Sequence, residues 1–142
     1  MDFLARREHS EQELARKLGA RGYAEDTVVA TLAALVADNL LSDARFAEAF
    51  VHSRIQRGSG PLKIRAELRE RGIAGDLIDT SLNTHSDSWR GLARQAREKR
   101  FGSVPPGDFR ERSRQMRFLQ QRGFTPGQIK AVLSQAGDDE YD

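Results

Sequence analysis

The chain has 142 residues, of which 38% are hydrophobic and 31% charged, and it contains no cysteine. This composition is too apolar for a disordered chain, and it excludes disulfides and cysteine-ligated metals. No segment approaches the roughly 18 continuous apolar residues of a membrane span, and the first residues lack the apolar core of a signal peptide. We therefore expect a cytoplasmic protein with the length of one ordinary domain or a short repeat array.

The net charge of +2 hides an uneven distribution along the chain. Residues 1–53 hold six basic and nine acidic side chains, whereas residues 54–130 hold seventeen basic and eight acidic ones. Residues 131–142 carry four acidic side chains and no basic one. A basic middle segment thus lies between acidic ends, and such asymmetry concerns the partners of a protein rather than its fold.

Apolar spacing and capping residues predict an all-helical chain. Ser10 and Glu13 have the spacing of a capping box, Pro61 suits a first helical position, and Ser42 and Ser86 are expected N-caps. Thr125 is a further expected cap, with Gln128 at the third helical position. No segment alternates with period two, so no strand is expected. The predicted helices lie near residues 2–8, 11–20, 25–37, 43–56, 61–71, 75–83, 87–100, 108–121 and 126–136.

Six positions recur three times along the chain, about fifty residues apart. In each copy a leucine is the last core residue of one helix, and an Arg-Gly pair ends that helix where a positive φ is needed. The apolar residue after glycine is expected to pack back on the helix, and two apolar residues four apart begin the next helix. The copies are Leu18, Arg21, Gly22, Tyr23, Val28 and Leu32; Leu68, Arg71, Gly72, Ile73, Ile78 and Leu82; and Leu119, Arg122, Gly123, Phe124, Ile129 and Leu133.

The recurrence predicts three tandem three-helix repeats at residues 1–53, 54–102 and 103–142. The third repeat is expected to be truncated, because no third helix follows Leu133. Prolines and glycines make Gly102–Gly107 the clearest break between helices, and Gly58–Gly60 is interpreted as a flexible linker. The inward residues expected in the third helices of the first two repeats are Phe46, Ala49 and Phe50, and Trp89, Leu92, Ala93 and Ala96.

No catalytic or metal-binding pattern is present in the sequence. His9, His52 and His85 are far apart and have no carboxylate or cysteine at ligand spacing. The Gly58–Pro61 segment lacks the Gly-Lys-Ser/Thr of a phosphate-binding loop. We therefore expect a binding protein without enzymatic activity, cofactor or metal.

Basic helix faces are the most informative feature. Arginines spaced i, i+4 and i+7 stack along one side of a helix. Residues 90–117 contain nine basic side chains but only three acidic ones. An anionic partner, either nucleic acid or an acidic protein surface, would explain this pattern; a solvated arginine-rich face is the alternative. The candidate contact residues are Lys63, Arg65, Arg69, Arg90, Arg94, Arg97, Arg110, Arg114 and Arg117.

Two kinds of nucleic-acid recognition are disfavoured by the sequence. The helices that follow the Arg-Gly corners, near 25–37, 75–83 and 126–136, hold a single basic residue, Lys130. Reading of the major groove by those helices is therefore not expected. The aromatic residues Trp89, Phe101, Phe109 and Phe118 fall mostly at inward positions, which favours a core role over base stacking.

The motifs together resemble the RecX family, whose members regulate the recombinase RecA. The matching segments, in the order of the family and over almost the whole chain, are Leu4-Ala5-Arg6-Arg7-Glu8-His9-Ser10 with Glu13-Leu14; Asp43-Ala44-Arg45-Phe46-Ala47-Glu48-Ala49-Phe50; Gly60-Pro61-Leu62-Lys63-Ile64-Arg65 with Glu67-Leu68 and Arg71-Gly72-Ile73; and Phe118-Leu119 with Arg122-Gly123-Phe124.

The resemblance implies an elongated, curved array of three helical repeats that binds in the groove of the RecA–DNA filament. It implies inhibition of the recombinase, ATPase and co-protease activities of RecA, without catalysis or cofactors. The nine basic residues are then the predicted RecA-filament contacts, and a non-specific DNA-binding protein is the alternative. Two departures from the family pattern are expected to matter: the chain begins inside the first helix of the family, and the third repeat ends in an acidic tail that has the charge to dock on the basic segment.

Overall fold

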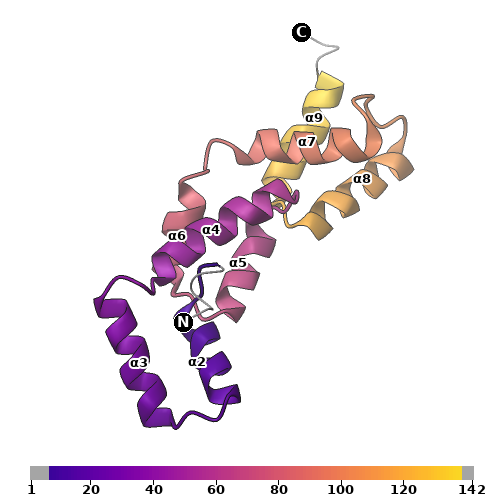
Figure 1. Cartoon of the computed structure of the whole chain (residues 1–142). Coiled ribbons are helices and arrows are strands. Elements are labelled where there is room, and N and C mark those ends of the chain that lie inside the picture. The colour runs from indigo at the N-terminus through magenta and orange to yellow at the C-terminus, as the bar shows by residue number, and fades with distance from the viewer. Residues whose placement is uncertain (1–6, 139–142) are drawn as a thin grey trace. The chain divides into compact units, whose positions relative to one another are not determined.

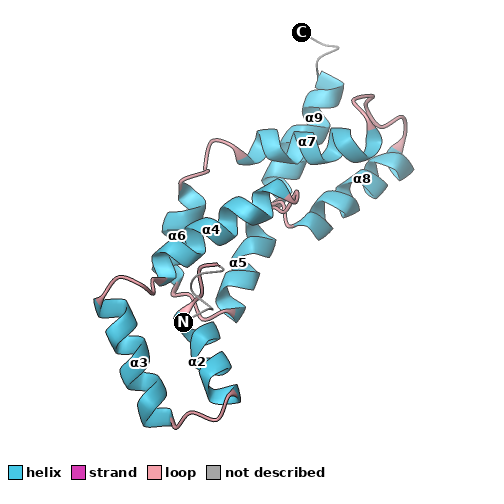
Figure 2. Cartoon of the chain, in the orientation of Figure 1, coloured by secondary structure: helices cyan, strands magenta, loops and turns pink. Residues whose placement is uncertain are grey.

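The computed structural model describes residues 7–138 of the chain, with side chains up to residue 134. This part of the chain forms eight helices and no strand (Figures 1 and 2). All eight agree with the predicted helices to within two residues, whereas the predicted helix 2–8 lies almost wholly outside the described residues. The helices are α2 (Glu11–Ala20), α3 (Glu25–Ala37), α4 (Asp43–Gln56), α5 (Pro61–Glu70), α6 (Gly75–Asn83), α7 (Trp89–Phe101), α8 (Phe109–Arg122) and α9 (Pro126–Asp138).

The three repeated Arg-Gly corners have the predicted geometry. Gly22, Gly72 and Gly123 adopt φ values of 91°, 82° and 98°, the left-handed region that glycine tolerates best. In each corner the leucine carbonyl accepts a hydrogen bond from the residue after glycine, at 3.3, 3.1 and 3.2 Å in chain order. The glycine N–H donates to the residue after that leucine, at 3.0 Å in all three copies. This pair of bonds is the Schellman motif, which satisfies the last carbonyls of the helix.

Side chains cap the helix starts where the sequence predicts them, with one exception. The Ser10 and Glu13 side chains each accept a hydrogen bond from the other's backbone N–H, both at 3.1 Å, and Thr125 and Gln128 form the same reciprocal pair before α9. The prediction of Ser86 as an N-cap is wrong. Residues 84–88 form turns, so α7 begins at Trp89.

Clustering of the helices divides the chain into two compact units. The first unit comprises Met1–His52 and Glu67–Ser81, and the second comprises Ser53–Ala66 and Leu82–Asp142. In the first unit α2 packs against α3. Their shared core contains the buried residues Leu14, Leu18, Val28 and Leu41, with Ala15, Leu32 and Leu35 partly buried around them.

In the second unit, α7, α8 and α9 pack against one another. The buried side chains of this unit include Ile64, Trp89, Ala93, Leu119, Phe124, Ile129, Val132 and Leu133. No helix in the described part of the chain is both long enough and apolar enough to span a bilayer.

Three predicted core positions differ in the structure. Ala49 is exposed, and Ala47 and Val51 are the residues of α4 that are buried beside Phe46. Phe109 is 83% exposed, because it is the first residue of α8 and has no preceding turn to cover it. Tyr23 is 55% exposed, whereas its counterparts Ile73 and Phe124 are buried. The residue after glycine therefore belongs to the core in the second and third corners but not in the first.

Candidate partner-binding site

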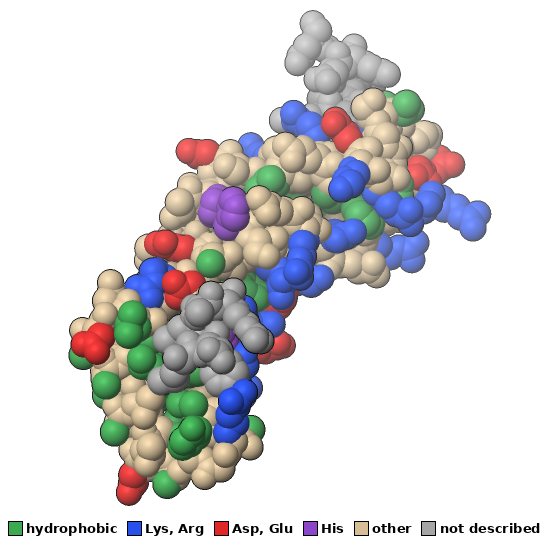
Figure 3. Space-filling view, viewed as in Figure 1, with side chains coloured by type: hydrophobic (Ala, Val, Ile, Leu, Met, Phe, Trp, Pro, Cys, Tyr) green, Lys and Arg blue, Asp and Glu red, His purple; other side chains and the backbone are tan. Residues whose placement is uncertain are grey.

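The second unit carries most of the predicted basic residues on exposed helix faces. Lys63 and the half-buried Arg65 lie on α5, Arg90 and Arg94 on α7, and Arg110, Arg114 and Arg117 on α8. Figure 3 shows Lys and Arg side chains gathered over the region that contains α8. Arg69 is exposed as well, but it belongs to the first unit. The sequence-predicted surface is therefore a property of the second unit, apart from Arg69.

The prediction is wrong for Arg97, which is only 2% exposed. Its Nε donates a hydrogen bond to Gln115 Oε1 at 2.9 Å, and its Nη2 donates to the Val104 carbonyl at 2.7 Å. Gln115 Nε2 in turn donates to Glu111 Oε1 at 3.2 Å, which brings a carboxylate close to the buried charge. Arg97 therefore ties α7 to α8 and to the loop between them, and it is not available to a partner. Its position one turn after the buried Ala93 is the sequence signal for this role.

Arginine side chains also surround a pair of aromatic rings between α7 and α8. Phe101 and Phe118 meet edge to face with centroids 5.3 Å apart. The guanidinium of Arg114 lies 5.2 Å from the Phe101 centroid and also pairs with Glu111 at 3.3 Å. The guanidinium of Arg122 lies 5.1 Å from the Phe118 centroid. These distances suit cation–π attraction, so Arg114 contributes to packing as well as to the surface charge.

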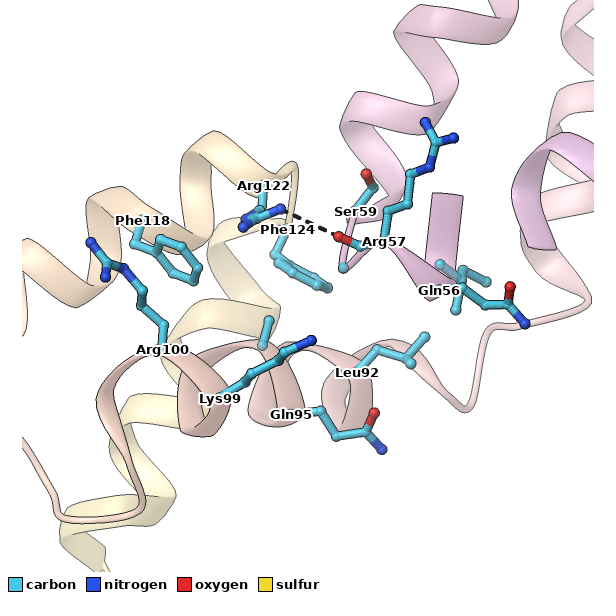
Figure 4. A pocket seen from close by; sticks show the side chains of 13 residues that line it. Gln56, Arg57, Ser59, Leu92, Gln95, Lys99, Arg100, Phe118, Arg122 and Phe124 are labelled. Atoms are coloured by element: carbon cyan, nitrogen blue, oxygen red, sulfur yellow. Dashed lines mark hydrogen bonds between the residues drawn. The ribbon is translucent and has the colours of Figure 1, made fainter. Parts of the chain in front are cut away.

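A groove of about 370 Å³ lies in the second unit beside this aromatic pair (Figure 4). Its walls come from the end of α4 and the following loop, from α7, and from the corner between α8 and α9. Four cationic side chains are among the lining residues, and no carboxylate is. The lining residues are Ile55, Gln56, Arg57, Gly58, Ser59, Leu92, Gln95, Ala96, Lys99, Arg100, Phe118, Arg122 and Phe124.

The cations of this groove are functional candidates that the sequence analysis missed. Lys99 and Arg100 lie in the last turn of α7, Arg57 follows the end of α4, and Arg122 is the last residue of α8, so none of them belongs to an i, i+4, i+7 series. Figure 4 shows Lys99 pointing into the groove, whereas the guanidinium of Arg57 points away from it. Only packing of the two corners on α7 brings these residues together, and no local sequence spacing indicates it.

Backbone contacts hold one wall of the groove in place. The Gly60 N–H donates to the Arg122 carbonyl at 2.6 Å, and the Leu62 N–H donates to the Gly123 carbonyl at 2.9 Å. The first N–H groups of α5 thus satisfy the last carbonyls of α8, groups that are unpaired in isolated helices. Ser59 and Gly60 are buried, and α4 ends in a further Schellman motif at Gly58. The interpretation of residues 58–60 as a flexible linker is therefore wrong.

The first unit contains a separate polar cluster around the buried His9. The His9 Nδ1 contacts the Arg7 carbonyl at 3.2 Å, and its Nε2 lies 2.8 Å from Lys17 Nζ. Burial lowers the pKa of His9, and the positive charges of Arg7 and Lys17 lower it further. The neutral ring therefore donates to the carbonyl and accepts from the ammonium group. Within the described residues, no three His, Cys, Asp or Glu side chains are grouped to hold a metal ion.

Comparison with known proteins assigns the tandem helices to one family. Models of the first, second and third three-helix domains of RecX match residues 1–35, 42–82 and 91–133. The regulatory protein RecX of Halorhodospira halophila is 48% identical over 138 residues, which cover 97% of this chain and 86% of that protein. The regulatory protein RecX of Chromohalobacter salexigens is 46% identical over 134 residues, covering 94% and 88%.

Two solved structures support the fold. RecX from Lactobacillus salivarius aligns with a TM-score of 0.83 at 20% identity, over 96% of this chain and 90% of that one. A second structure, of regulatory protein RecX, aligns with a TM-score of 0.80 at 24% identity, over 94% and 67%. The protein is thus an array of tandem three-helix domains. It belongs to the RecX family of regulatory proteins.

The matched ranges group the helices differently from the predicted repeats. They place α4 with α5 and α6, and α7 with α8 and α9. The packing of α7 on both α8 and α9 agrees with this grouping. The third matched domain then comprises α7, α8 and α9. In the second and third matched domains the repeated corner lies between the second and third helices, so the corner does not show where a domain begins.

Proposed function

We propose that the protein regulates the recombinase RecA by binding the RecA–DNA filament and limiting its recombinase, ATPase and co-protease activities. The observation that carries this proposal is the match of three RecX domains, in order, along the chain. The 48% identity to a protein named regulatory protein RecX supports the same role over nearly the full length. The RecA partner itself comes from the family resemblance of the sequence.

The proposed contact surface consists of exposed cations in the second unit. Arg90, Arg94, Arg110 and Arg117 are exposed and form no ion pair with a carboxylate of the described residues. Exposed, unpaired arginines of like charge repel one another at helical spacing, and an anionic partner removes that repulsion. Their planar guanidinium groups bind carboxylates or phosphates in two-point geometry. Lys63, Arg65 and Arg114 complete the proposed surface, and Arg97 is excluded because it is buried.

Charge reversal at two sites tests the surface. We choose Arg94→Glu with Arg117→Glu and leave Arg114 intact, because its contacts with Glu111 and Phe101 would confound the result. Arg16→Glu with Lys130→Glu is the matched control: both residues are exposed, lie outside the surface, and change the net charge by the same amount. Affinity for preformed RecA–DNA filaments should fall at least tenfold in the first variant and stay within about twofold in the control.

The same experiment with bare DNA separates a filament-binding regulator from a non-specific DNA-binding protein. The basic surface and the absence of carboxylates in the groove also suit phosphate groups, which makes DNA binding the second candidate. A DNA-binding protein would bind bare DNA with an affinity that falls steeply with salt and needs no RecA. A filament-binding regulator should bind filaments more tightly than bare DNA at the same salt. Equal binding to both would contradict the proposal.

A further inference from the structure

We propose that the groove of the second unit binds a short acidic peptide segment that carries one apolar side chain between its carboxylates. This inference goes beyond the proposed function, because it assigns a ligand class to residues outside the predicted surface. Lys99 is nine residues from Arg90, so the two side chains leave α7 about 180° apart. A partner can therefore occupy the groove independently of the face that carries Arg90 and Arg94.

The rim of the groove selects for negative charge. Lys99, Arg100 and Arg122 line it, the guanidinium of Arg57 points away from it, and no carboxylate is among the lining residues. Arg122 donates one Nη1 hydrogen bond to the Arg57 carbonyl at 3.3 Å, and a guanidinium has five N–H donors, so most of its donors remain for a ligand. Like charges concentrated at one concave site attract an anionic partner and disfavour a cationic one.

Two of these cations are held in place before any ligand binds. Figure 4 shows the Phe118 ring between the side chains of Arg100 and Arg122. The guanidinium carbons lie 6.0 and 5.1 Å from the ring centroid. Stacking on an aromatic ring leaves the N–H edges of a guanidinium available to carboxylates. Because the side chains are already ordered, binding loses less conformational entropy.

The floor of the groove selects for an apolar side chain. Its apolar lining consists of the half-buried Leu92, Ala96 and Ile55 and the buried Phe124. A volume of about 370 Å³ is at the low end for ligand pockets, which suits one side chain and its flanking backbone. An apolar floor with a polar, charged rim is the arrangement found where a peptide anchors one residue.

The aromatic rings favour a peptide over nucleic acid. Single-stranded nucleic acids bind by stacking bases on exposed aromatic faces. Phe118 has guanidinium groups beside it, and Phe124 is only 2% exposed. Neither ring offers an open face to a base, whereas both contribute apolar surface to the floor. The groove thus has the charge to attract phosphate but lacks a base-binding platform.

Fluorescence anisotropy of a labelled peptide tests this inference with the full chain and no recombinase. The probe is Gly-Asp-Glu-Leu-Asp-Glu-Gly at about physiological ionic strength. We expect saturable binding that weakens at least tenfold when Asn and Gln replace the acids, and at least threefold when Ser replaces Leu. Lys99→Glu should weaken binding at least tenfold. The matched control Lys130→Glu, at an exposed position on α9 outside the groove, should change it less than twofold.

Several results would overturn the inference. Absence of binding, or equal binding of the Leu and Ser peptides, would show that the groove does not recognise an apolar anchor. Tighter binding of an oligothymidylate of equal charge, lost in Lys99→Glu, would assign the groove to nucleic acid instead. Because RecA is absent from the assay, such a failure leaves the proposed RecA regulation to its own test.

Discussion

Gly123 is where the structure leaves least room for a side chain, and we predict that Gly123→Ala strongly destabilises the second unit. The residue ends α8 with φ 98°, and a Cβ there would collide with the backbone and side chain of Lys63 on α5. The opposing Gly60 is equally confined, because its Cβ would lie 2.5 Å from the Gly123 carbonyl carbon. These contacts coincide with the hydrogen bonds that join α5 to α8.

The magnitude follows from comparison of three glycines in the same unit. Gly58 has φ 85° but only an ordinary contact at 3.9 Å, so Gly58→Ala introduces backbone strain alone. That strain is about 1–2 kcal/mol, and the stiffer unfolded chain offsets about 0.4–1 kcal/mol of it, which leaves about 1 kcal/mol. Gly60→Ala introduces overpacking alone, about 1–3 kcal/mol. Gly123→Ala combines both effects, so we expect a loss of about 2–4 kcal/mol.

Urea unfolding followed by Trp89 fluorescence measures these values. Trp89 is the single tryptophan, and it is buried in the second unit, so its emission reports on that unit. Far-UV circular dichroism provides an independent probe of helix loss. Destabilisation should increase from Gly58→Ala through Gly60→Ala to Gly123→Ala. The slope of the unfolding free energy against urea concentration, the m-value, should stay unchanged. Equal losses for Gly58→Ala and Gly123→Ala would refute the steric argument and remove the basis for a fixed groove wall.

Three further predictions concern buried polar groups. Arg97→Met should lower the free energy of unfolding of the second unit by about 1–3 kcal/mol, because the buried Gln115 loses its hydrogen-bond donor. A change below about 0.5 kcal/mol in urea unfolding would contradict this role of Arg97. The pKa of His9 is lowered from 6.5 in the folded state, so the first unit should lose stability as pH falls below 6.5. His9→Gln should remove that part of the pH dependence. If the free energy of unfolding falls equally with pH in the variant and the wild type, the role of His9 is refuted. Ser10→Ala removes the capping box of α2 and should lower the free energy of unfolding of the first unit by about 1 kcal/mol, as measured by thermal unfolding. Ser86 caps no helix, so Ser86→Ala should have little effect in the same measurement.

The helices and their corners were predictable because their chemistry is local. The repeated pattern of a leucine, an Arg-Gly pair three residues later and an apolar residue after it specifies a helix end, and Gly22, Gly72 and Gly123 all adopt that geometry. The cap at Thr125 likewise depends on residues three apart in sequence. The periodicity of apolar residues then located the helices between these ends.

The remaining features depend on contacts between distant residues. The burial of Arg97 follows from the position of Gln115, eighteen residues later on α8. The loop at Gly58–Gly60 is fixed by carbonyls of Arg122 and Gly123, which no local pattern connects to it. The groove cations converge only after α7 packs against the corner at Phe124. A search for like charges at helical spacing finds stripes on single helices, and it misses sites that several elements assemble.

The proposed regulation of RecA by this RecX-family protein can be measured as a change in DNA-dependent ATP hydrolysis by the cognate RecA. We predict that the wild-type protein, added well below the concentration of RecA, slows hydrolysis on preformed filaments. The Arg94→Glu, Arg117→Glu variant should need at least tenfold more protein for half-maximal inhibition, and the Arg16→Glu, Lys130→Glu control should act like the wild type. Unchanged ATP hydrolysis at equimolar wild-type protein, with the protein folded by circular dichroism, would contradict the proposed function.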